Sequence, residues 1–273
     1  MNEDLESLPP RPESGRFSGK RAFVSGGGSG IGRAIVHRLV AEGIAAITIA
    51  DVRSDRVDQV RGELNGTSTL VVPLTADLGD PGSARAGIEK ATAEMGGLDI
   101  LIANHAMVSS GTFLTETVEN WNRVFEVNTA SYFVLAQTAA RQMIAAGRGG
   151  AILFTGAAVE RGGATGHGIA YGSSKWAVLG MVKGMAVMLA PHRIRVCAVS
   201  PGAVDTNLAI DAVGEEAGNR AKAGAAAGLA IGRMARPDEL AAMYAFLASD
   251  EASYVSGSNH WVDGGWMGPS QPS

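Results

Sequence analysis

Apolar runs of strand length alternate with amphipathic stretches of helix length along most of the chain. The strand candidates are RAFVSG, AAITIAD, TLVVPLTAD, DILIAN, AILFTG, IRVCAVSPG and NHWVDGG. The helix candidates are IGRAIVHRLVAEG, a segment ending near Asn65, NWNRVFEVNTASYFVLAQTAARQMIAAG, the segment from Ala170 to Ala190, and PDELAAMYAFLAS. Strands separated by helices pair in parallel, because each return needs a long right-handed crossover. The pattern predicts an α/β fold class: a single-domain doubly wound Rossmann fold, with a mostly parallel sheet, helices on both faces and sites at the carboxyl ends of the strands.

Two segments interrupt this alternation. Residues 1–15 are polar and hold three of the ten prolines, so we expect a flexible tail ahead of one Rossmann-fold domain over 16–273. Residues 207–233 are rich in alanine and glycine and follow a strand directly. They suggest a weakly held helical lid over a site, which we call the lid segment, although a plain surface helix has the same composition.

Composition narrows the possible partners. The net charge of −4 and the scattered arginines form no basic stripe, so nucleic acid is not expected as a partner. No apolar run approaches the roughly 18 residues needed to span a bilayer, and the amino terminus lacks an export signal. We therefore expect a cytoplasmic protein that does not contact membranes. Cys197, the single cysteine, lies in the apolar strand IRVCAV and is expected to be a packing residue. No metal site is predicted.

A glycine-rich turn, SGGGSGIG, joins the first strand to the first helix. Glycines there permit positive φ and let backbone N–H groups approach a pyrophosphate at the positive end of the helix. Their spacing, with three residues and then one between the glycines, differs from the usual G-x-G-x-x-G signature. The turn predicts a dinucleotide site formed by Gly26, Ser29, Gly30, Ile31 and Gly32.

Acidic residues end the next two strands. Asp51 lies where a carboxylate would accept hydrogen bonds from the ribose hydroxyls, which favours NAD over NADP. The alternatives are that Asp51 caps the helix near Ser54, or that Arg53 binds a 2′-phosphate instead. Asp77 is a candidate for the adenine amino group, with Leu78 covering the ring, and a simple loop cap is the competing interpretation.

The segment YGSSK places Tyr171 and Lys175 on one helix face, four residues apart. A nearby ammonium favours phenolate and lowers the pKa of a tyrosine toward the working range of an acid/base catalyst. The pair indicates a site of proton transfer.

The motifs together resemble the short-chain dehydrogenase/reductase family from about residue 18 to 266. The similarity rests on SGGGSGIG, DILIANHA, Asn128 in VFEVNTASYF, YGSSK, VSPGAVDT and VSGSNHWVDGG. It implies that Tyr171 is the general acid/base, and that Lys175 is its electrostatic partner and also holds the nicotinamide ribose. It further implies that Asn128 connects the lysine to solvent through water. The remaining implied cofactor contacts are Asn104, Pro201, Gly202, Val204 and Thr206.

The chain departs from the family pattern at two positions. His105 replaces a small residue, and we expect it to be a structural histidine. The strand that delivers the family's catalytic serine reads ILFTGAA, which places the serine position at Ala157, with Ala158 as the alternative. Thr155 carries a hydroxyl, but strand alternation does not guarantee that it faces substrate. A serine-to-alanine form is expected to be less active.

The resulting expectation is an NAD-dependent oxidoreductase that interconverts a secondary alcohol and a ketone, as a homo-oligomer, with a tetramer implied by the family. The alternatives are a catalytically silent nucleotide-binding protein and an NADP-dependent ketone reductase. The carboxyl-terminal helix PDELAAMYAFLAS and the strand NHWVDGG are expected in a subunit interface, because Trp261 and Trp266 leave large apolar surface near a sheet edge. The alternative is that both tryptophans pack into the core of their own chain. The substrate pocket is expected to be framed by the lid segment and by Met107, Val159, Glu160 and His167, which suits a bulky cyclic or aromatic alcohol.

Overall fold

The computed structural model describes residues 15–109, 111–158, 168–225 and 229–266. Its centre is a seven-stranded sheet with the order β3-β2-β1-β4-β5-β6-β7, in which every neighbouring pair is parallel. The sheet is wholly parallel, in one domain, which confirms the predicted fold class. The strands are β1 (Arg21–Ser25), β2 (Ala46–Asp51), β3 (Leu70–Thr75), β4 (Ile100–Ala103), β5 (Gly150–Thr155), β6 (Ile194–Pro201) and β7 (Asn259–Val262).

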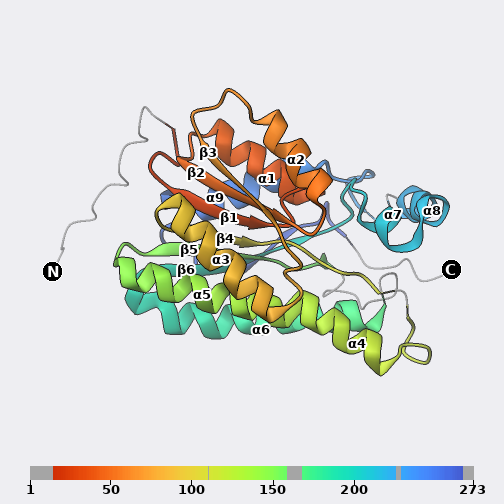
Figure 1. Cartoon of the computed structure of the whole chain (residues 1–273). Helices are drawn as coiled ribbons and strands as arrows, with labels where there is room; N and C mark the ends of the chain where they lie inside the picture. Colours follow the sequence, from red (N-terminus) through yellow and green to blue (C-terminus); the bar gives the residue numbers. More distant parts are fainter. Residues whose placement is uncertain (1–14, 110, 159–167, 226–228, 267–273) are drawn as a thin grey trace.

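Helices cover both faces of the sheet (Figure 1). One face buries α1 (Gly30–Ala41), α2 (Ser54–Glu63) and α9 (Pro237–Ala248), and the other buries α3 (Pro81–Met95), α5 (Ser131–Ala146) and α6 (Ile169–Leu189). Cys197 is fully buried in the first of these two cores, which confirms its expected packing role. The strand order reverses between β1 and β4, so the connections that follow these two strands lead to opposite faces of the sheet. In such sheets the crevice between these connections is where ligands bind.

Local sequence explains where α3 begins and ends. The Asp80 carboxylate accepts a hydrogen bond from the Ser83 N–H at 2.7 Å, and Pro81 occupies the first helical position. Gly96 ends the helix in the left-handed conformation, with φ of 71°.

The long helix predicted around 120–147 is interrupted. It consists of α4 (Val118–Phe125), a π-helical turn η1 (Glu126–Ala130) and α5. A π turn adds a residue to the helical repeat and often marks a functional site. Here it carries Asn128, whose side chain is fully buried.

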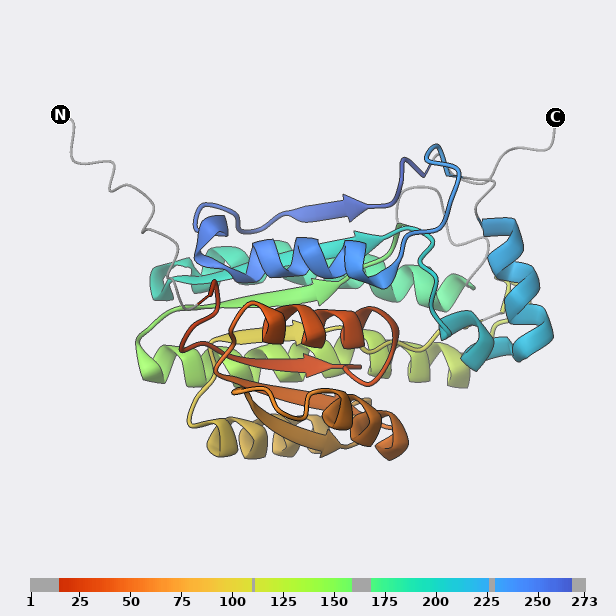
Figure 2. The same cartoon turned by 90° about the horizontal axis from the view of Figure 1, so that it is seen from above.

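The lid segment contains α7 (Leu208–Val213) and α8 (Glu215–Ala225). In Figure 2 the strand arrows point toward the side on which these helices lie, so both are at the carboxyl-end edge of the sheet. Two short 3-10 turns, η3 (Ala190–His192) and η5 (Asp250–Ala252), lie near the opposite edge. Among the described residues, no helix has the length and apolarity to cross a membrane.

Candidate functional site

The glycine turn is shaped by close backbone contacts. Gly26 has φ of +63°, and a Cβ placed on Gly32 would lie 1.9 Å from the Gly26 carbonyl oxygen. Neither position therefore tolerates a side chain. Ser29 is the N-cap residue of α1, which begins at Gly30 and includes Ile31 and Gly32. The first turn of a helix has N–H groups without a partner inside the helix, which suits a pyrophosphate.

Asp51 lies beside this turn. One carboxylate oxygen accepts from the Gly28 N–H at 3.2 Å, and the other accepts from the Arg53 N–H at 3.0 Å. The side chain does not cap α2 in its first turn, because its partners lie before the helix. Asp51 therefore joins the glycine turn to the residue that precedes α2. The Arg53 guanidinium instead bonds the Asp55 carboxylate at 2.9 and 2.7 Å.

Arg56 is a neighbour of the turn that sequence analysis did not identify. Its Nη1 lies 3.4 Å from the Ser29 hydroxyl, and its Nη2 forms an ion pair with Asp211 on α7. The ion pair joins residues 155 positions apart, so no local pattern signals it.

Asp77 and Leu78 lie at the loop after β3. The Asp77 carboxylate accepts from the Gly79 N–H at 2.9 Å and bonds Arg123 at 2.9 Å, so the loop-cap interpretation describes its observed contacts. The Leu78 side chain is buried in the core under α3. The side chain therefore packs in the chain's own core, and the expected contact with an adenine ring stays a prediction.

Asn104 connects β4 to its neighbours at the carboxyl edge. Its N–H donates to the Ser25 hydroxyl at 2.9 Å, and its Nδ2 lies 3.4 Å from the Gly26 carbonyl oxygen. The Thr155 hydroxyl donates to its Oδ1 at 3.1 Å. Asn104 therefore fixes the glycine turn to β4 and β5.

The loop after β6 closes the same edge. Pro201 ends β6, and the Gly202 N–H donates to the Val262 carbonyl oxygen at 3.0 Å. Val204 pairs with Ala235 in an isolated bridge. A Cβ on Gly30 would lie 3.1 Å from the Thr206 side chain, so this loop packs against the glycine turn.

Tyr171 and Lys175 share one face of α6. The Lys175 side chain is fully buried, and its Nζ donates to the Thr155 carbonyl oxygen at 2.7 Å. The ammonium lies 5.8 Å from the ring centre of Tyr171 and 5.0 Å from that of Tyr132. These aromatic faces and the carbonyl offset the cost of burying the charge. Tyr171 is only 6 % exposed.

Asn128 on the π turn is held on both sides of its amide. Its Oδ1 accepts from the Met107 N–H, and its Nδ2 donates to the Met107 carbonyl, both at 2.8 Å. Nδ2 also lies 3.0 Å from the Ser174 hydroxyl, which donates to the Tyr171 carbonyl at 2.7 Å. Ser174, which sequence analysis missed, thus links the π turn to the helix turn that carries Tyr171 and Lys175.

His105 is a structural residue, as expected. The Ser131 hydroxyl donates to the Val127 carbonyl, so it accepts from the His105 Nε2–H at 2.8 Å. The other ring nitrogen accepts from the Ser25 hydroxyl at 2.7 Å. Burial, and secondly the charge of Lys175, lower the pKa of His105 to about 3, so the ring is neutral.

The loop after β5 carries the position of the expected serine. Ala157 and Ala158 are 6 % and 4 % exposed. The Thr155 hydroxyl lies 2.6 Å from the Tyr244 hydroxyl on α9, across the sheet from α6, so it does not substitute for a serine beside Tyr171. Among the substrate residues named from sequence, Met107 is partly buried next to Asn128, while Val159, Glu160 and His167 lie outside the described residues.

A polar cluster of Ser109, Glu116 and Asn120 packs against the residue that precedes α6. It was not identified from sequence. The Ser109 hydroxyl bonds Glu116 and accepts from Asn120 Nδ2 at 3.3 Å. A Cβ on Gly168, three residues before Tyr171, would lie 2.7 Å from that hydroxyl. The bonds from Asn120 and then Ser109 lower the pKa of Glu116. The cluster therefore packs against Gly168, the residue before α6.

Known proteins resemble the chain over most of its length. A family model described as "Enoyl-(Acyl carrier protein) reductase" matches residues 26–267. The 3-alpha-(or 20-beta)-hydroxysteroid dehydrogenase of Mycobacterium tuberculosis is 34% identical over 252 residues, which are 92% of this chain and 91% of the relative. The cis-4-hydroxycyclohexanecarboxylate dehydrogenase of Sinomonas cyclohexanicum is 36% identical, over 92% of this chain and 97% of the relative.

A solved structure gives the same assignment. The short-chain type dehydrogenase/reductase of Mycobacterium marinum superposes with a TM-score of 0.85 at 34% identity, covering 92% of this chain and 96% of that one. The chain that matches these relatives also has the features described above: the parallel sheet, the glycine turn and the helix with Tyr171 and Lys175. The chain belongs to the short-chain dehydrogenase/reductase family of oxidoreductases.

Proposed function

We propose that the protein interconverts a cyclic secondary alcohol and the corresponding ketone, with NAD as the hydride carrier. The observation that carries the proposal is the buried Lys175 ammonium, 5.8 Å from the Tyr171 ring, on the edge of the sheet that also holds the glycine turn. A pure nucleotide-binding protein has no use for this costly burial of a charge.

NAD, when bound, supplies or accepts the hydride. The turn from Gly26 to Gly32 would hold its pyrophosphate, Asp51 its adenosine ribose, and Lys175 its nicotinamide ribose. Tyr171 would give a proton to the carbonyl oxygen of a ketone, or remove one from the hydroxyl of an alcohol. Lys175 stabilises the phenolate that remains. Asn128 and Ser174 hold the helix turn that carries both residues.

Two arrangements support NAD rather than NADP. The Asp51 carboxylate would repel a 2′-phosphate at close range. The two nearby arginines are engaged elsewhere: Arg53 bonds Asp55, and Arg56 bonds Asp211. An NADP-dependent ketone reductase would need one of them to be released.

The substrate class is inferred from the site and from the relatives. Met107 and apolar residues of the lid segment, such as Leu208 and Ile210, are the residues that we expect to contact the apolar part of a substrate. The relatives named above act on hydroxysteroids and on a hydroxycyclohexane ring. A ring-bound secondary alcohol is therefore the substrate class that we would test first. We expect the protein to act in the cytoplasm as a homotetramer.

Ala157 occupies the position at which the family pattern has its serine. Without that hydroxyl, the developing oxyanion has Tyr171 as its remaining donor, so turnover should be slow. Slow turnover distinguishes this proposal from that of a silent binding protein, which should show none.

The test is an initial-rate survey with NAD and NADP on hydroxysteroids, substituted cyclohexanols and linear alcohols, with the unchanged protein beside Ala157→Ser. Oxidation of a ring-bound alcohol, faster in the variant and abolished by Tyr171→Phe, is expected. Cofactor binding without turnover in either protein would favour the silent binding protein. A preference for NADP would favour the ketone reductase.

A further inference from the structure

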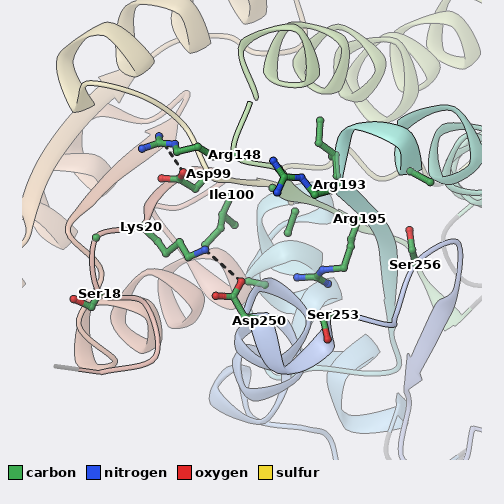
Figure 3. A pocket seen from close by; sticks show the side chains of 17 residues that line it. Ser18, Lys20, Asp99, Ile100, Arg148, Arg193, Arg195, Asp250, Ser253 and Ser256 are labelled. Atoms are coloured by element: carbon green, nitrogen blue, oxygen red, sulfur yellow. Dashed lines mark hydrogen bonds and ion pairs between the residues drawn. The ribbon is translucent and has the colours of Figure 1, made fainter. Parts of the chain in front are cut away.

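A cavity lies at the edge of the sheet opposite the proposed active site. It has a volume of about 610 Å³ and is lined by residues at the amino ends of β1, β4, β5 and β6 and at the carboxyl end of α9 (Figure 3). The glycine turn and Tyr171 lie at the carboxyl ends of the same strands. Ligands in this cavity would therefore not compete with the cofactor or with an alcohol.

The lining carries an excess of positive charge. Lys20, Arg148, Arg193 and Arg195 face two carboxylates, those of Asp99 and Asp250, which leaves two positive charges uncompensated. Figure 3 shows the charged side chains surrounding the cavity. A concave site with one dominant sign of charge concentrates ions of the opposite sign.

Arg193 and Arg195 have no carboxylate partner among the described residues. The Arg193 Nη2 donates to the Gly147 carbonyl oxygen at 2.5 Å, and Arg195 donates to the Leu247 and Ser249 carbonyl oxygens at 2.6 and 2.9 Å. Each guanidinium has five N–H donors, so further donors remain on both. Arg193 also has φ of 57°, the single positive φ at a non-glycine residue of the described chain, and such strain is often found at binding sites.

The two carboxylates are already shared. Asp99 bonds Arg21 at 2.8 Å and lies 3.2 Å from Arg148, so one negative charge serves two guanidinium groups. Asp250 lies 3.3 Å from the Lys20 ammonium. The Arg148 side chain remains 53% exposed, so much of it is open to solvent beside the cavity.

We propose that this cavity binds a small phosphate monoester, whose phosphate group is held by Arg148 and Arg193. A phosphate monoester carries a charge of about −1.5 to −2 at neutral pH, which matches the two uncompensated positive charges. Guanidinium groups bind phosphate oxygens with paired hydrogen bonds. The cavity volume lies within the range of roughly 300–1,000 Å³ typical of small-molecule sites, so there is room for an organic group beside the phosphate. The inference does not rest on the proposed function.

The test is calorimetric titration of the full chain with glycerol 3-phosphate, inorganic phosphate and glycerol at constant ionic strength. Each titration is run with and without saturating NAD, because the glycine turn is itself a phosphate site. Binding of glycerol 3-phosphate should persist with NAD present, and glycerol should not bind. Equal binding of inorganic phosphate would identify free phosphate as the ligand of the same site.

The variants Arg148→Gln and Arg193→Gln should each weaken the binding by about tenfold, the effect of losing a hydrogen bond to a charged group. Arg148→Lys should restore part of the loss. The matched control is Arg236→Gln, an exposed arginine that bonds Asp238 at the other end of α9. Unchanged NAD affinity in every variant shows that the fold is intact. The proposal is overturned if glycerol 3-phosphate fails to bind at millimolar concentration, or binds equally to the wild-type protein and both glutamine variants.

Discussion

Arg56 on α2 and Asp211 on α7 form an ion pair in which one guanidinium nitrogen lies 2.9 and 2.8 Å from the two carboxylate oxygens. The other terminal nitrogen lies 3.4 Å from the Ser29 hydroxyl in the glycine turn. The pair therefore connects the lid segment to the adenosine side of the proposed cofactor site. The Arg56 guanidinium therefore lies near the turn that Asp51 bonds, but its charge is paired with Asp211 of the lid segment.

Removing this carboxylate should change cofactor selectivity. In Asp211→Asn, Arg56 is free to bind a 2′-phosphate, so the affinity for NADP should rise about three- to tenfold relative to NAD, the scale of a partly exposed charged contact. Titration of both cofactors by tryptophan fluorescence measures the ratio.

The control for Asp211→Asn is Asp205→Asn, which removes a second ion pair of the lid segment, with Lys222 at 2.8 Å. It should leave the ratio unchanged. In the double variant with Arg56→Gln the gain should disappear, and a gain that survives there would show that Arg56 is not its source.

Restoring the serine should raise turnover. Ala157→Ser places a hydroxyl donor near the oxygen that gains charge, and one preorganised donor changes kcat by about 10²–10³. Ala158→Ser tests the alternative serine position, which is buried to nearly the same degree. Steady-state rates at saturating NAD measure both. No gain in either variant would contradict the assigned serine position.

Substitutions of Tyr171 and of Lys175 should have different effects on turnover and NAD affinity. Tyr171→Phe should abolish turnover with NAD affinity nearly unchanged, because the phenol acts on the reacting oxygen. Lys175→Met should reduce turnover and NAD affinity together, and should also lower stability, since its Nζ bonds the Thr155 carbonyl inside the core. Rates, NAD titrations and thermal unfolding of the two variants measure this. A Tyr171→Phe protein with the parent rate would contradict the acid/base role.

Acid should destabilise the protein through His105. Its pKa is lowered from 6.5 to about 3 in the folded state, so the unfolded state binds more protons between these values. The stabilisation is therefore present above about pH 6.5 and is lost as the pH falls toward 3, by at most about 1.4 kcal/mol per pH unit.

Urea unfolding of His105→Gln at pH 7, 6 and 5 tests this linkage. The variant should be less stable at pH 7, because the bonds to Ser25 and Ser131 are disturbed, but its stability should fall less steeply on acidification. His192→Gln, at an exposed position in η3, should keep the wild-type slope. Equal slopes in all three proteins would rule out His105 as the titrating group.

Exposed apolar side chains on α5 and α6 are expected to form a subunit interface. Phe133 and Ile144 on α5, and Trp176 and Val187 on α6, are each eleven residues apart, so each pair lies on one helix face. Trp176 and Val187 are 56% and 77% exposed. Val187→Glu should therefore yield smaller species in sedimentation, whereas Tyr254→Glu, at a fully exposed position elsewhere, should not.

The same measurement tests the interface expected at Trp261, which is 36% exposed on β7. The apolar side chains of α9, including Leu240 and Leu247, are buried in the chain's own core. If this edge forms an interface, β7 is the element that forms it, and Trp261→Glu should yield smaller species in sedimentation. Unchanged sedimentation of Trp261→Glu would remove β7 from the assembly.

Local pattern along the chain was enough to predict the parallel sheet and the sheet edge that carries the proposed site. Strand and helix periods follow from local spacing, and a parallel connection has one favoured hand, so alternation alone leads to this topology. The glycine turn and the Tyr171–Lys175 pair were also visible, because both depend on neighbours a few residues apart. The packing role of Cys197 and the structural role of His105 followed from residue type and surroundings in the chain.

The contacts between distant segments could not be predicted from local pattern and follow from the folded arrangement. The π turn at Asn128 has no local signature, and it exists because the amide bonds Met107 and Ser174 from other elements. Thr155 carried a suitable hydroxyl, and the fold directs it to Tyr244 on the opposite face. The Arg56–Asp211 pair and the basic cavity bring together charges from strand ends and loops that are far apart in sequence. Such contacts depend on which strand ends lie next to each other in the folded sheet. The spacing of residues along the chain does not reveal this.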